Sequence, residues 1–324
     1  MTRQEEAMNG ESRLFRELSK DQIEEILFFH FQEAGSGYSL LEGGMFNTTY
    51  SVTLTGEKRY VLRVGPVNRH LLLPFETALM TSEKWFYQLC AGKNVPVPKV
   101  VACVTDQKRI DRDYMITEYI DSVCLNSEKI STREKQKLYF ELGSITANFH
   151  AIEGRQFGRV SDVMTGRGYE SWGRYLRSEF SQTVERLKPY RLFDGGILDK
   201  IEQIPVVYGE VLNDIQKAQL VHADLWEGNV LISPSHRRVA AVIDADRGLF
   251  GDAAYEFAGG WMNSDAFFAG YGEVDLGHPR AALRQKIYRL LYRLIDTYVY
   301  FVEYNDTENG DQTRKIVLEL AAEL

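Results

Sequence analysis

The sequence from residue 219 to residue 246 is Gln219-Leu-Val-His-Ala-Asp-Leu-Trp-Glu-Gly-Asn-Val-Leu-Ile-Ser-Pro-Ser-His-Arg-Arg-Val-Ala-Ala-Val-Ile-Asp-Ala-Asp246. Two apolar runs flank its short polar loop, which predicts brief buried strands at Leu220–Val221 and Asn229–Ile232. Pro234 and the serines beside it predict a turn over Ser233–Arg238. The β-branched residues of Val239–Ile243 predict a third strand.

Three polar residues of this segment have the chemistry that phosphoryl transfer needs. Asp224 and Asn229 are five positions apart on one loop, and Asp244 follows fifteen positions later, at the end of a strand. Phosphoryl transfer needs a base that orients the acceptor hydroxyl and oxygen ligands that hold magnesium on the phosphates. We expect Asp224 to accept a hydrogen bond from the hydroxyl, and Asn229 and Asp244 to bind Mg²⁺.

The same segment resembles a known group of kinases. Its His-x-Asp-x-x-x-x-Asn spacing, followed by Ile-Asp, is similar to the catalytic loop and metal-binding aspartate of protein kinases. Together with Gly251-Asp-Ala-Ala-Tyr-Glu-Phe-Ala258, it resembles the aminoglycoside phosphotransferase family, which includes choline-kinase-like, fructosamine-kinase-like, homoserine-kinase-like and hygromycin-phosphotransferase-like enzymes. The resemblance implies an α+β, bilobal protein-kinase-like fold that acts on small molecules. We expect His222 to hold the loop rather than to act as a base.

Composition limits the classes of function. The chain has 324 residues, of which 44% are apolar and 26% charged, and its net charge is −8. An acidic balance argues against nucleic-acid binding, which favours a basic stripe, and is compatible with a cationic substrate. The three cysteines, at positions 90, 103 and 124, lack metal-binding or redox spacing. No apolar run is long enough to span a membrane, so we expect a cytoplasmic enzyme.

A strand–loop–strand unit opens the predicted small lobe. Tyr38–Leu41, Thr48–Leu54 and Arg59–Val64 are the expected strands, and Glu42-Gly-Gly-Met-Phe-Asn47 joins the first two. The family has a nucleotide loop at this place, so the resemblance assigns Gly43, Gly44 and Asn47 to nucleotide binding. Glycine lets the backbone approach phosphates without an obstructing Cβ. A plain hairpin turn is the alternative for such a Gly-Gly pair.

The third of these strands carries Arg63 among apolar neighbours. Protein kinases place a lysine here to hold the α- and β-phosphates. Arginine departs from that pattern, although it is always charged and can fork onto phosphate oxygens. Leu72–Cys90 is predicted to be helical, and the resemblance favours Glu83 on this helix as the acid that pairs with Arg63. The alternatives are an arginine in solvent at a strand edge and a solvated helix glutamate.

Two further strands complete the small lobe. Val100–Val104 and Tyr114–Tyr119 are expected to extend the sheet to five antiparallel strands beside one helix. Kinases bind adenine through backbone groups of the hinge, so the resemblance assigns the peptide units of Glu118 and Ile120 to the nucleotide. We predict a nucleotide-binding lobe with a leading helix over residues 1–120 and a larger, mainly helical catalytic and substrate lobe over residues 121–324.

The segment after Asp244 favours a small acceptor. Only eleven residues separate Asp244 from Glu256, whereas a protein kinase uses a longer activation segment to seat a peptide. We interpret Glu256 as a brace for the backbone of the catalytic loop. Asp246 is either a metal ligand, a substrate contact or a turn residue.

The rest of the predicted large lobe is mainly helical. Ser131-Thr-Arg-Glu134 is a capping box that predicts the start of a helix. Asn263–Pro279 is expected to be a loop, and the acidic run Glu303–Asp311 is expected to link to a last helix, Gln312–Leu324. An acidic rim there would suit a substrate with amino groups, and a solvated charged loop is the alternative.

These observations predict an Mg²⁺-dependent phosphotransferase. It would move the γ-phosphoryl group of ATP or GTP to a hydroxyl of a small molecule, with an aminoglycoside-like or amino-sugar acceptor favoured. Two alternatives remain: a kinase of a fructosamine-, choline- or homoserine-type metabolite, and a nucleotide-binding pseudokinase that acts as a scaffold. Neither a nucleic acid nor a membrane is an expected partner.

Overall fold

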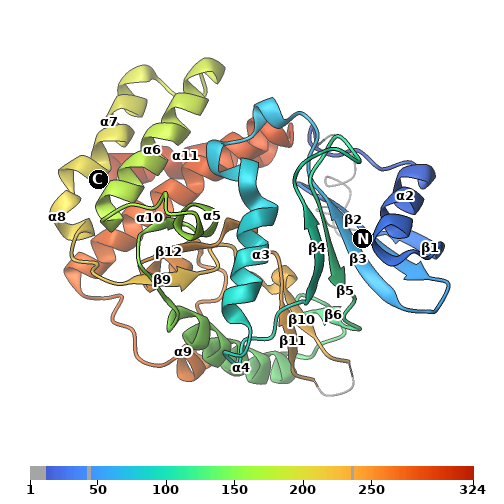
Figure 1. Ribbon diagram of the computed structural model, residues 1–324. Coiled ribbons are helices and arrows are strands. Elements are labelled where there is room, and N and C mark those ends of the chain that lie inside the picture. Colours follow the sequence, from blue (N-terminus) through green and yellow to red (C-terminus); the bar gives the residue numbers. More distant parts are fainter. Residues whose placement is uncertain (1–11, 42–44, 235–236) are drawn as a thin grey trace.

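A five-stranded sheet and a large helical region make up the protein. The structure is a computed structural model that describes residues 12–41, 45–234 and 237–324. In Figure 1 the sheet and helix α2 lie on the right, and the helices α6, α7, α10 and α11 gather on the left. Helix α3, drawn in cyan, runs between the two parts and packs against both β4 and α5. The protein therefore has the α+β, protein-kinase-like architecture that the sequence predicts.

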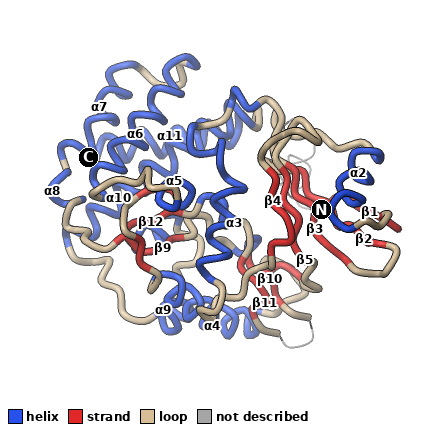
Figure 2. The backbone as a smooth tube through the Cα atoms, viewed as in Figure 1, coloured by secondary structure: helices blue, strands red, loops and turns tan. Residues whose placement is uncertain are grey.

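The sheet is antiparallel throughout, with the strand order β1-β2-β3-β5-β4. Its strands follow one another in Figure 2 as a single red layer. Their bounds are β1 Gly35–Leu40, β2 Thr48–Leu54, β3 Arg59–Val64, β4 Val100–Val104 and β5 Tyr114–Glu118. The prediction of five antiparallel strands is confirmed. The predicted boundary between residues 120 and 121 falls in the connection that follows β5, and its status as a domain boundary stays a prediction.

The alternation of side chains along the strands determines which residues face helix α2 and which face away from it. Helix α2, Lys20–Phe31, buries Ile23 and Leu27 against Val52 and Leu62 on one face. Neighbouring positions point to the opposite face, because successive strand side chains alternate. Arg63 is therefore on the face turned away from α2, where it is paired with Thr49 and Met115 of the adjacent strands.

Helix α3 begins later than the sequence predicted. It covers Leu79–Cys90, and a 3-10 helix, Pro74–Ala78, precedes it. The carboxylate of Glu76 accepts a hydrogen bond from the backbone N–H of Leu73 at 2.8 Å, which caps this 3-10 helix. The expected helix Leu72–Cys90 is thus correct only in its second part, because the local cap stabilises a tighter turn at its start.

The C-terminal part contains the remaining helices and two small sheets. Strands β9, β10 and β11 confirm the three strands predicted around the catalytic loop. The helices are α4 Thr132–His150, α5 Val160–Met164, α6 Trp172–Leu187, α7 Gly195–Val207, α8 Gly209–Leu212, α9 Asp265–Tyr271, α10 Pro279–Tyr298 and α11 Thr307–Glu323. The small sheets have the orders β11-β10-β6 and β7-β9-β12-β8, with β6 Val123–Cys124, β7 Glu153–Gly154, β8 Gly158–Arg159, β9 Ala218–Val221, β10 Val230–Ile232, β11 Val239–Val242 and β12 Leu249–Gly251.

Two expectations for the C-terminal region are wrong. The expected loop over Asn263–Pro279 contains helix α9, whose N-cap Ser264 accepts a hydrogen bond from the N–H of Phe267. The expected acidic linker contains the first turns of α11, because Asp306 caps that helix by accepting from the N–H of Asn309. In both cases a short polar side chain that suits a loop also serves as an N-cap.

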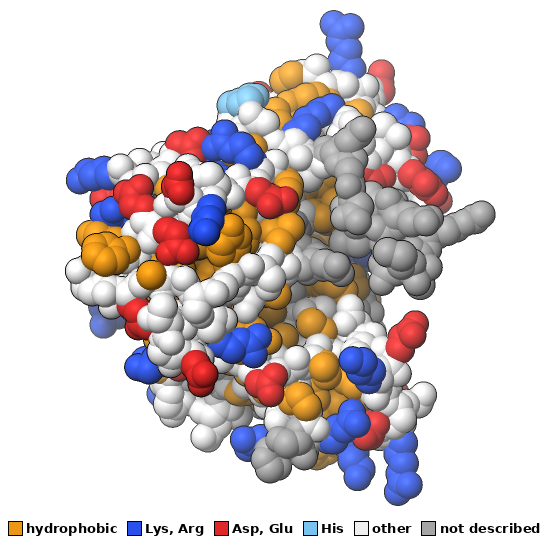
Figure 3. Space-filling view, turned by 90° about the vertical axis from the view of Figure 1, so that its right-hand side faces the viewer, with side chains coloured by type: hydrophobic (Ala, Val, Ile, Leu, Met, Phe, Trp, Pro, Cys, Tyr) orange, Lys and Arg blue, Asp and Glu red, His pale blue; other side chains and the backbone are white. Residues whose placement is uncertain are grey.

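The surface carries charges of both signs (Figure 3). On the face drawn in Figure 3, acidic and basic side chains of the described residues are interspersed, with hydrophobic side chains between them. Among the residues that the structure describes, no helix combines the length and apolarity needed to cross a membrane.

Candidate active site

The loop between β9 and β10 brings Asp224 and Asn229 together. The Asn229 side-chain nitrogen donates to the backbone oxygen of Asp224 at 2.8 Å and to its Oδ2 at 3.1 Å. Asn229 is buried, and its Oδ1 takes part in neither bond. The loop therefore fixes the Asp224 carboxylate and keeps an amide oxygen as a candidate metal ligand.

Buried polar contacts hold the backbone of this loop. Glu256 accepts hydrogen bonds from the N–H groups of His222 and Ala223 at 2.7 and 3.1 Å. Ala223 has a φ of +64°, a left-handed conformation that is strained for a residue with a Cβ. The carboxylate thus stabilises a strained turn directly before Asp224, and the predicted bracing role of Glu256 is confirmed.

His222 connects the loop to the strand that carries Asp244. Its Nδ1 accepts from the N–H of Asp224 at 3.3 Å, and its Nε2 lies 2.9 Å from the carbonyl oxygen of Ile243. These partners need Nδ1 as an acceptor and Nε2 as a donor, which is the neutral ring. Burial lowers the pKa of His222, in agreement with a neutral ring. The expectation that His222 holds the loop is confirmed.

Asp244 lies next to Asn229 at the end of β11. The N–H of Ile243 donates to the carbonyl oxygen of Asn229 at 2.9 Å, so the two segments are hydrogen-bonded at the site. Asp244 has a φ of +62° and donates its N–H to the hydroxyl of Tyr87 at 3.1 Å. Sequence analysis missed Tyr87, although its position four residues after Glu83 puts both on one helix face.

Arg63 is held by carboxylates from two parts of the chain. Its Nη1 lies 2.5 Å from both oxygens of Glu83, and its Nη2 lies 2.5 Å from Oδ1 of Asp244. The Arg63 side chain is 12% exposed and that of Glu83 is 1% exposed. Asp246 is a third acid, 3.6 Å from the same guanidinium. The predicted pairing of Arg63 with Glu83 is present, and the alternatives of a solvated arginine and glutamate are excluded.

The site concentrates negative charge around Arg63. Although burial opposes its charge, Asp244 and Glu83 raise the pKa of the Arg63 guanidinium. Burial disfavours ionisation of Asp244 as well, but Arg63 outweighs it and lowers the pKa of that carboxyl. Burial and the charge of Asp244 raise the pKa of Asp246 well above its usual range. The site thus has an excess of acidic groups and would gain from a cation.

Asp224 is protonated more readily than an ordinary aspartate. Burial raises the pKa of its carboxyl to about 8, and the negative charges of Asp244 and Asp296 act in the same direction. Arg247 opposes this shift, and its own guanidinium lies 3.5 Å from Glu76. A carboxyl with this proton affinity is largely protonated at pH 7, and once ionised it is a strong enough base to accept a proton from a hydroxyl. Sequence analysis missed Arg247 and had no spacing signal for it.

The metal ligands predicted from sequence fit Mg²⁺ with a bound nucleotide. Among the described residues, no group of three or more His, Cys, Asp or Glu side chains could hold a metal ion. Mg²⁺ commonly uses one or two protein oxygens and takes its other ligands from phosphates and water. The Asn229 amide oxygen and the Asp244 carboxylate are such a pair, so the donor set fits magnesium.

The other residues predicted to contact the nucleotide are Gly43, Gly44, Asn47, Glu118 and Ile120. Gly43 and Gly44 lie outside the described residues. Asn47 is buried, and its Oδ1 has no hydrogen-bond partner among the described residues. Glu118 ends β5, and Ile120 follows it in the connection to β6.

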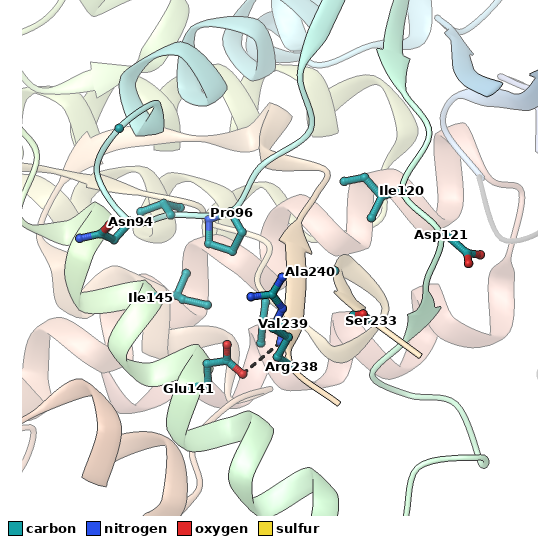
Figure 4. Close-up of a pocket in the computed structure, with 12 residues that line it drawn as sticks. Asn94, Pro96, Ile120, Asp121, Glu141, Ile145, Ser233, Arg238, Val239 and Ala240 are labelled. Atoms are coloured by element: carbon teal, nitrogen blue, oxygen red, sulfur yellow. Dashed lines mark hydrogen bonds between the residues drawn. The ribbon is translucent and has the colours of Figure 1, made fainter. Parts of the chain in front are cut away.

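A cavity of about 680 Å³ adjoins this connection. Figure 4 shows Ile120 and Asp121 on one side of it, Pro96 and Asn94 on another, and Glu141 and Ile145 of α4 below. None of Arg63, Asp224, Asn229 and Asp244 lines the cavity. The cavity and the candidate catalytic residues thus have no lining residue in common.

Comparison with known proteins gives one family and a set of similar folds. The model of the phosphotransferase enzyme family matches residues 37–285. No curated protein sequence matches the chain. Solved structures with a similar fold include three kinases or proposed kinases.

One is a thermostable mutant of aminoglycoside phosphotransferase APH(4)-Ia in ternary complex with AMP-PNP and hygromycin B. It has 18% identity and a TM-score of 0.67, and the match covers 93% of this chain and 98% of that one. A putative fructosamine-3-kinase from Thermobifida fusca has 16% identity and a TM-score of 0.66, with 93% and 100% covered. A mutant aminoglycoside 2'-phosphotransferase-IIIa in complex with GDP has 15% identity and a TM-score of 0.63, with 94% and 98% covered.

Proposed function

Since the chain belongs to the phosphotransferase enzyme family and is a small-molecule kinase, we propose that it transfers the γ-phosphoryl group of ATP or GTP to a hydroxyl of an amino-sugar or aminoglycoside-like acceptor. One observation carries the proposal. Asp224, Asn229 and Asp244 lie on two hydrogen-bonded segments, next to an arginine fixed by two carboxylates. Phosphoryl transfer depends mainly on positioning and on electrostatic stabilisation, and this arrangement supplies both.

In this mechanism Asp224 receives the proton of the acceptor. Its carboxylate accepts a hydrogen bond from the hydroxyl, and the hydroxyl oxygen forms a bond to the γ-phosphorus as the bond to the β-phosphate oxygen breaks. The proton passes to ionised Asp224, whose raised pKa of about 8 makes its carboxylate a stronger base than an ordinary aspartate. The products are the phosphorylated acceptor and the nucleoside diphosphate.

Arg63 would hold the phosphates. The guanidinium presents its donors in a planar fork, and Glu83 fixes one arm of that fork from a buried position. The other arm contacts Asp244, so the arginine lies between the acid that positions it and a candidate metal ligand. The loop from Gly43 to Asn47 would cover the phosphates, and the peptide units of Glu118 and Ile120 would contact the base.

Asn229 and Asp244 would hold Mg²⁺ on the nucleotide. The bound ion would neutralise charge on the transferring phosphoryl group. Its charge would also relieve the repulsion between Asp244 and Asp224, which favours the ionised form of the base.

The excess of carboxyl groups around Asp224 supports an acceptor with amino groups. Asp296 lies close enough to raise the pKa of Asp224, after burial itself, and its carboxylate also pairs with Arg293 at 2.8 Å. The hygromycin B in the complex of a structural neighbour is an acceptor of the proposed kind.

The test is nucleoside diphosphate release by the purified protein. Mg·ATP or Mg·GTP is combined in turn with aminoglycosides, fructosamine-type adducts, choline and homoserine. We expect stimulation by an amino-sugar compound and a loss of at least about 100-fold in Asp224→Asn, since general base catalysis contributes about that much or more. Asp199→Asn, the same change at an exposed position of α7, is the matched control.

The other outcomes separate the alternatives. Stimulation by choline, homoserine or a fructosamine adduct alone would identify a metabolite kinase. Nucleotide binding without turnover on any acceptor would favour the pseudokinase scaffold. Normal turnover in the Asp224→Asn variant would refute the assigned base.

A further inference from the structure

Two of the four tryptophans are exposed, and both are close to the catalytic loop. Trp226 and Trp261 are 41% and 40% exposed, whereas Trp172 is fully buried in the core. Trp226 is two residues after Asp224, and its backbone N–H donates to the Asp224 carbonyl oxygen at 3.2 Å. Single exposed hydrophobic residues are common and need no explanation. What distinguishes Trp226 and Trp261 is that both lie close to the catalytic loop and that a glycine lies against each ring.

Trp261 reaches the catalytic loop through Tyr292. The two rings meet edge to face with centroids 5.9 Å apart. The hydroxyl of Tyr292 donates to the carbonyl oxygen of Ala223 at 3.1 Å, and Tyr292 is buried. One buried side chain thus separates Trp261 from the residue that precedes Asp224.

Both rings lie against a glycine. A Cβ added to Gly228 would lie 2.2 Å from the Trp226 ring, and a Cβ added to Gly259 would lie 2.6 Å from the Trp261 ring. These separations are too short for any real Cβ, so only glycine permits each ring to lie where it does. Each indole therefore packs against the backbone on one side and is open to solvent elsewhere. Each ring is thus held against backbone, Trp226 on the catalytic loop itself and Trp261 next to a tyrosine that is hydrogen-bonded to it.

We propose that Trp226 and Trp261 form an aromatic acceptor platform that binds the ring of an amino sugar. The proposal rests on the proposed function and names the side chains that would select the acceptor. The apolar C–H face of a sugar ring can pack on an indole, and an ammonium group is attracted to the π face of tryptophan more strongly than to other aromatic rings.

The exposure of the rings distinguishes this platform from a cage for a compact cation. A quaternary ammonium is enclosed by several aromatic faces, whereas each of these rings is about 40% exposed. A sugar ring, which has an extended C–H face, fits such half-exposed rings better than choline does.

The test measures acceptor KM in single variants of the full chain. We expect Trp226→Ala and Trp261→Ala each to raise the KM for the stimulating amino sugar about tenfold, and the Phe variants to raise it less, because a smaller aromatic face remains. The KM for ATP should change less than about twofold and serves as the internal reference. Phe28→Ala, an exposed aromatic on α2, is the matched control.

A second pair of variants keeps both indoles. Gly228→Ala and Gly259→Ala place a methyl group beneath the rings, so each should raise the acceptor KM while the tryptophan is present. Hygromycin B should also change the tryptophan fluorescence of the Mg·ADP complex saturably, and Trp226→Phe and Trp261→Phe should each remove part of this change.

Different experimental results would refute the aromatic acceptor platform and the proposed function. Unchanged acceptor KM in the Ala variants of an active enzyme would overturn the platform and leave the kinase assignment in place. If no acceptor supports turnover, the proposed function fails, and the fluorescence titration decides on the platform alone. Saturation by choline but not by hygromycin B, or saturation by neither compound, would overturn it.

Discussion

Replacement of Arg63 by alanine tests the electrostatic centre of the site. The side chain is 12% exposed and contacts Glu83, which is 1% exposed, and Asp244, which is 37% exposed. Its removal leaves Glu83 without its cation inside the protein. The loss of one partner from a buried ion pair lowers the free energy of unfolding by about 3–5 kcal/mol.

The structure favours the lower part of that range. Glu83 also accepts a hydrogen bond from the hydroxyl of Tyr87, so it retains a donor after the change. Asp244 is partly open to water, which screens its uncompensated charge. We therefore expect Arg63→Ala to lower the free energy of unfolding by about 3 kcal/mol at pH 8.

The loss should depend on pH. Burial raises the pKa of Glu83 even with Arg63 present. Removal of Arg63 raises it further above the value in the unfolded chain, so ionised Glu83 destabilises the variant. This destabilisation is largest at high pH and shrinks as the pH falls and Glu83 takes up a proton. Urea unfolding of the wild type and the variant at pH 8 and pH 5.5, followed by circular dichroism, measures the difference.

Two further variants control this experiment. Arg63→Ala/Glu83→Gln removes the uncompensated charge, and we expect it to recover at least half of the lost stability. Arg174→Ala breaks an exposed ion pair with Glu170 and should change stability by less than about 1 kcal/mol. A loss below 1 kcal/mol in Arg63→Ala, or the absence of any recovery in the double variant, would refute the reasoning.

Three other predictions concern the loop and its supports. Glu256→Ala should lower the free energy of unfolding by about 3 kcal/mol, because it leaves two buried N–H groups without an acceptor, and Glu256→Gln should lower it by about half as much; equal losses in urea titrations would contradict this. Because burial lowers the pKa of His222, the unfolded chain binds a proton first, and stability should fall as the pH drops below 6.5, by up to about 1.4 kcal/mol per pH unit. His222→Gln should reduce this slope in unfolding experiments between pH 7.5 and pH 5.5, and an unchanged slope would assign it to other groups. Ser131→Ala removes the N-cap of α4 and should lower stability by about 1 kcal/mol without a change in turnover; a reduced turnover would mean that α4 acts on the site.

Local patterns predicted the strands and the order of the site residues. β2 and β3 were assigned with the bounds that the structure has, because β-branched residues alternate between clear turns. Asp224 and Asn229 were recognised from their spacing on one loop, and a five-residue loop brings its own ends together without help from the rest of the chain. Two of the errors occurred at Ser264 and Asp306, where a polar residue in an apparent loop proved to be an N-cap.

Long-range contacts could not be derived from spacing alone. Arg63 and Asp244 are 181 positions apart, and Glu256 reaches back 34 positions to His222. The position of Trp261 near Ala223 depends on Tyr292 from α10. The ion pair of Arg63 with Glu83 was expected from family resemblance, and its second contact, with Asp244, was not expected.

The sequence by itself determined the five strands of the sheet, the helix that begins after the capping box at Ser131, and the acids and amide of residues 219–246 that are the candidate catalytic groups. These depend on backbone propensity and on side chains a few positions apart, which act within one turn or one strand. Only the tertiary structure decided that one arginine is shared by Glu83 and Asp244, that Glu256 supports the strained turn, and that two tryptophans lie on glycines beside the catalytic loop. Such contacts form when the sheet, α3 and α10 pack together, because the distance between side chains remote in sequence depends on the whole core.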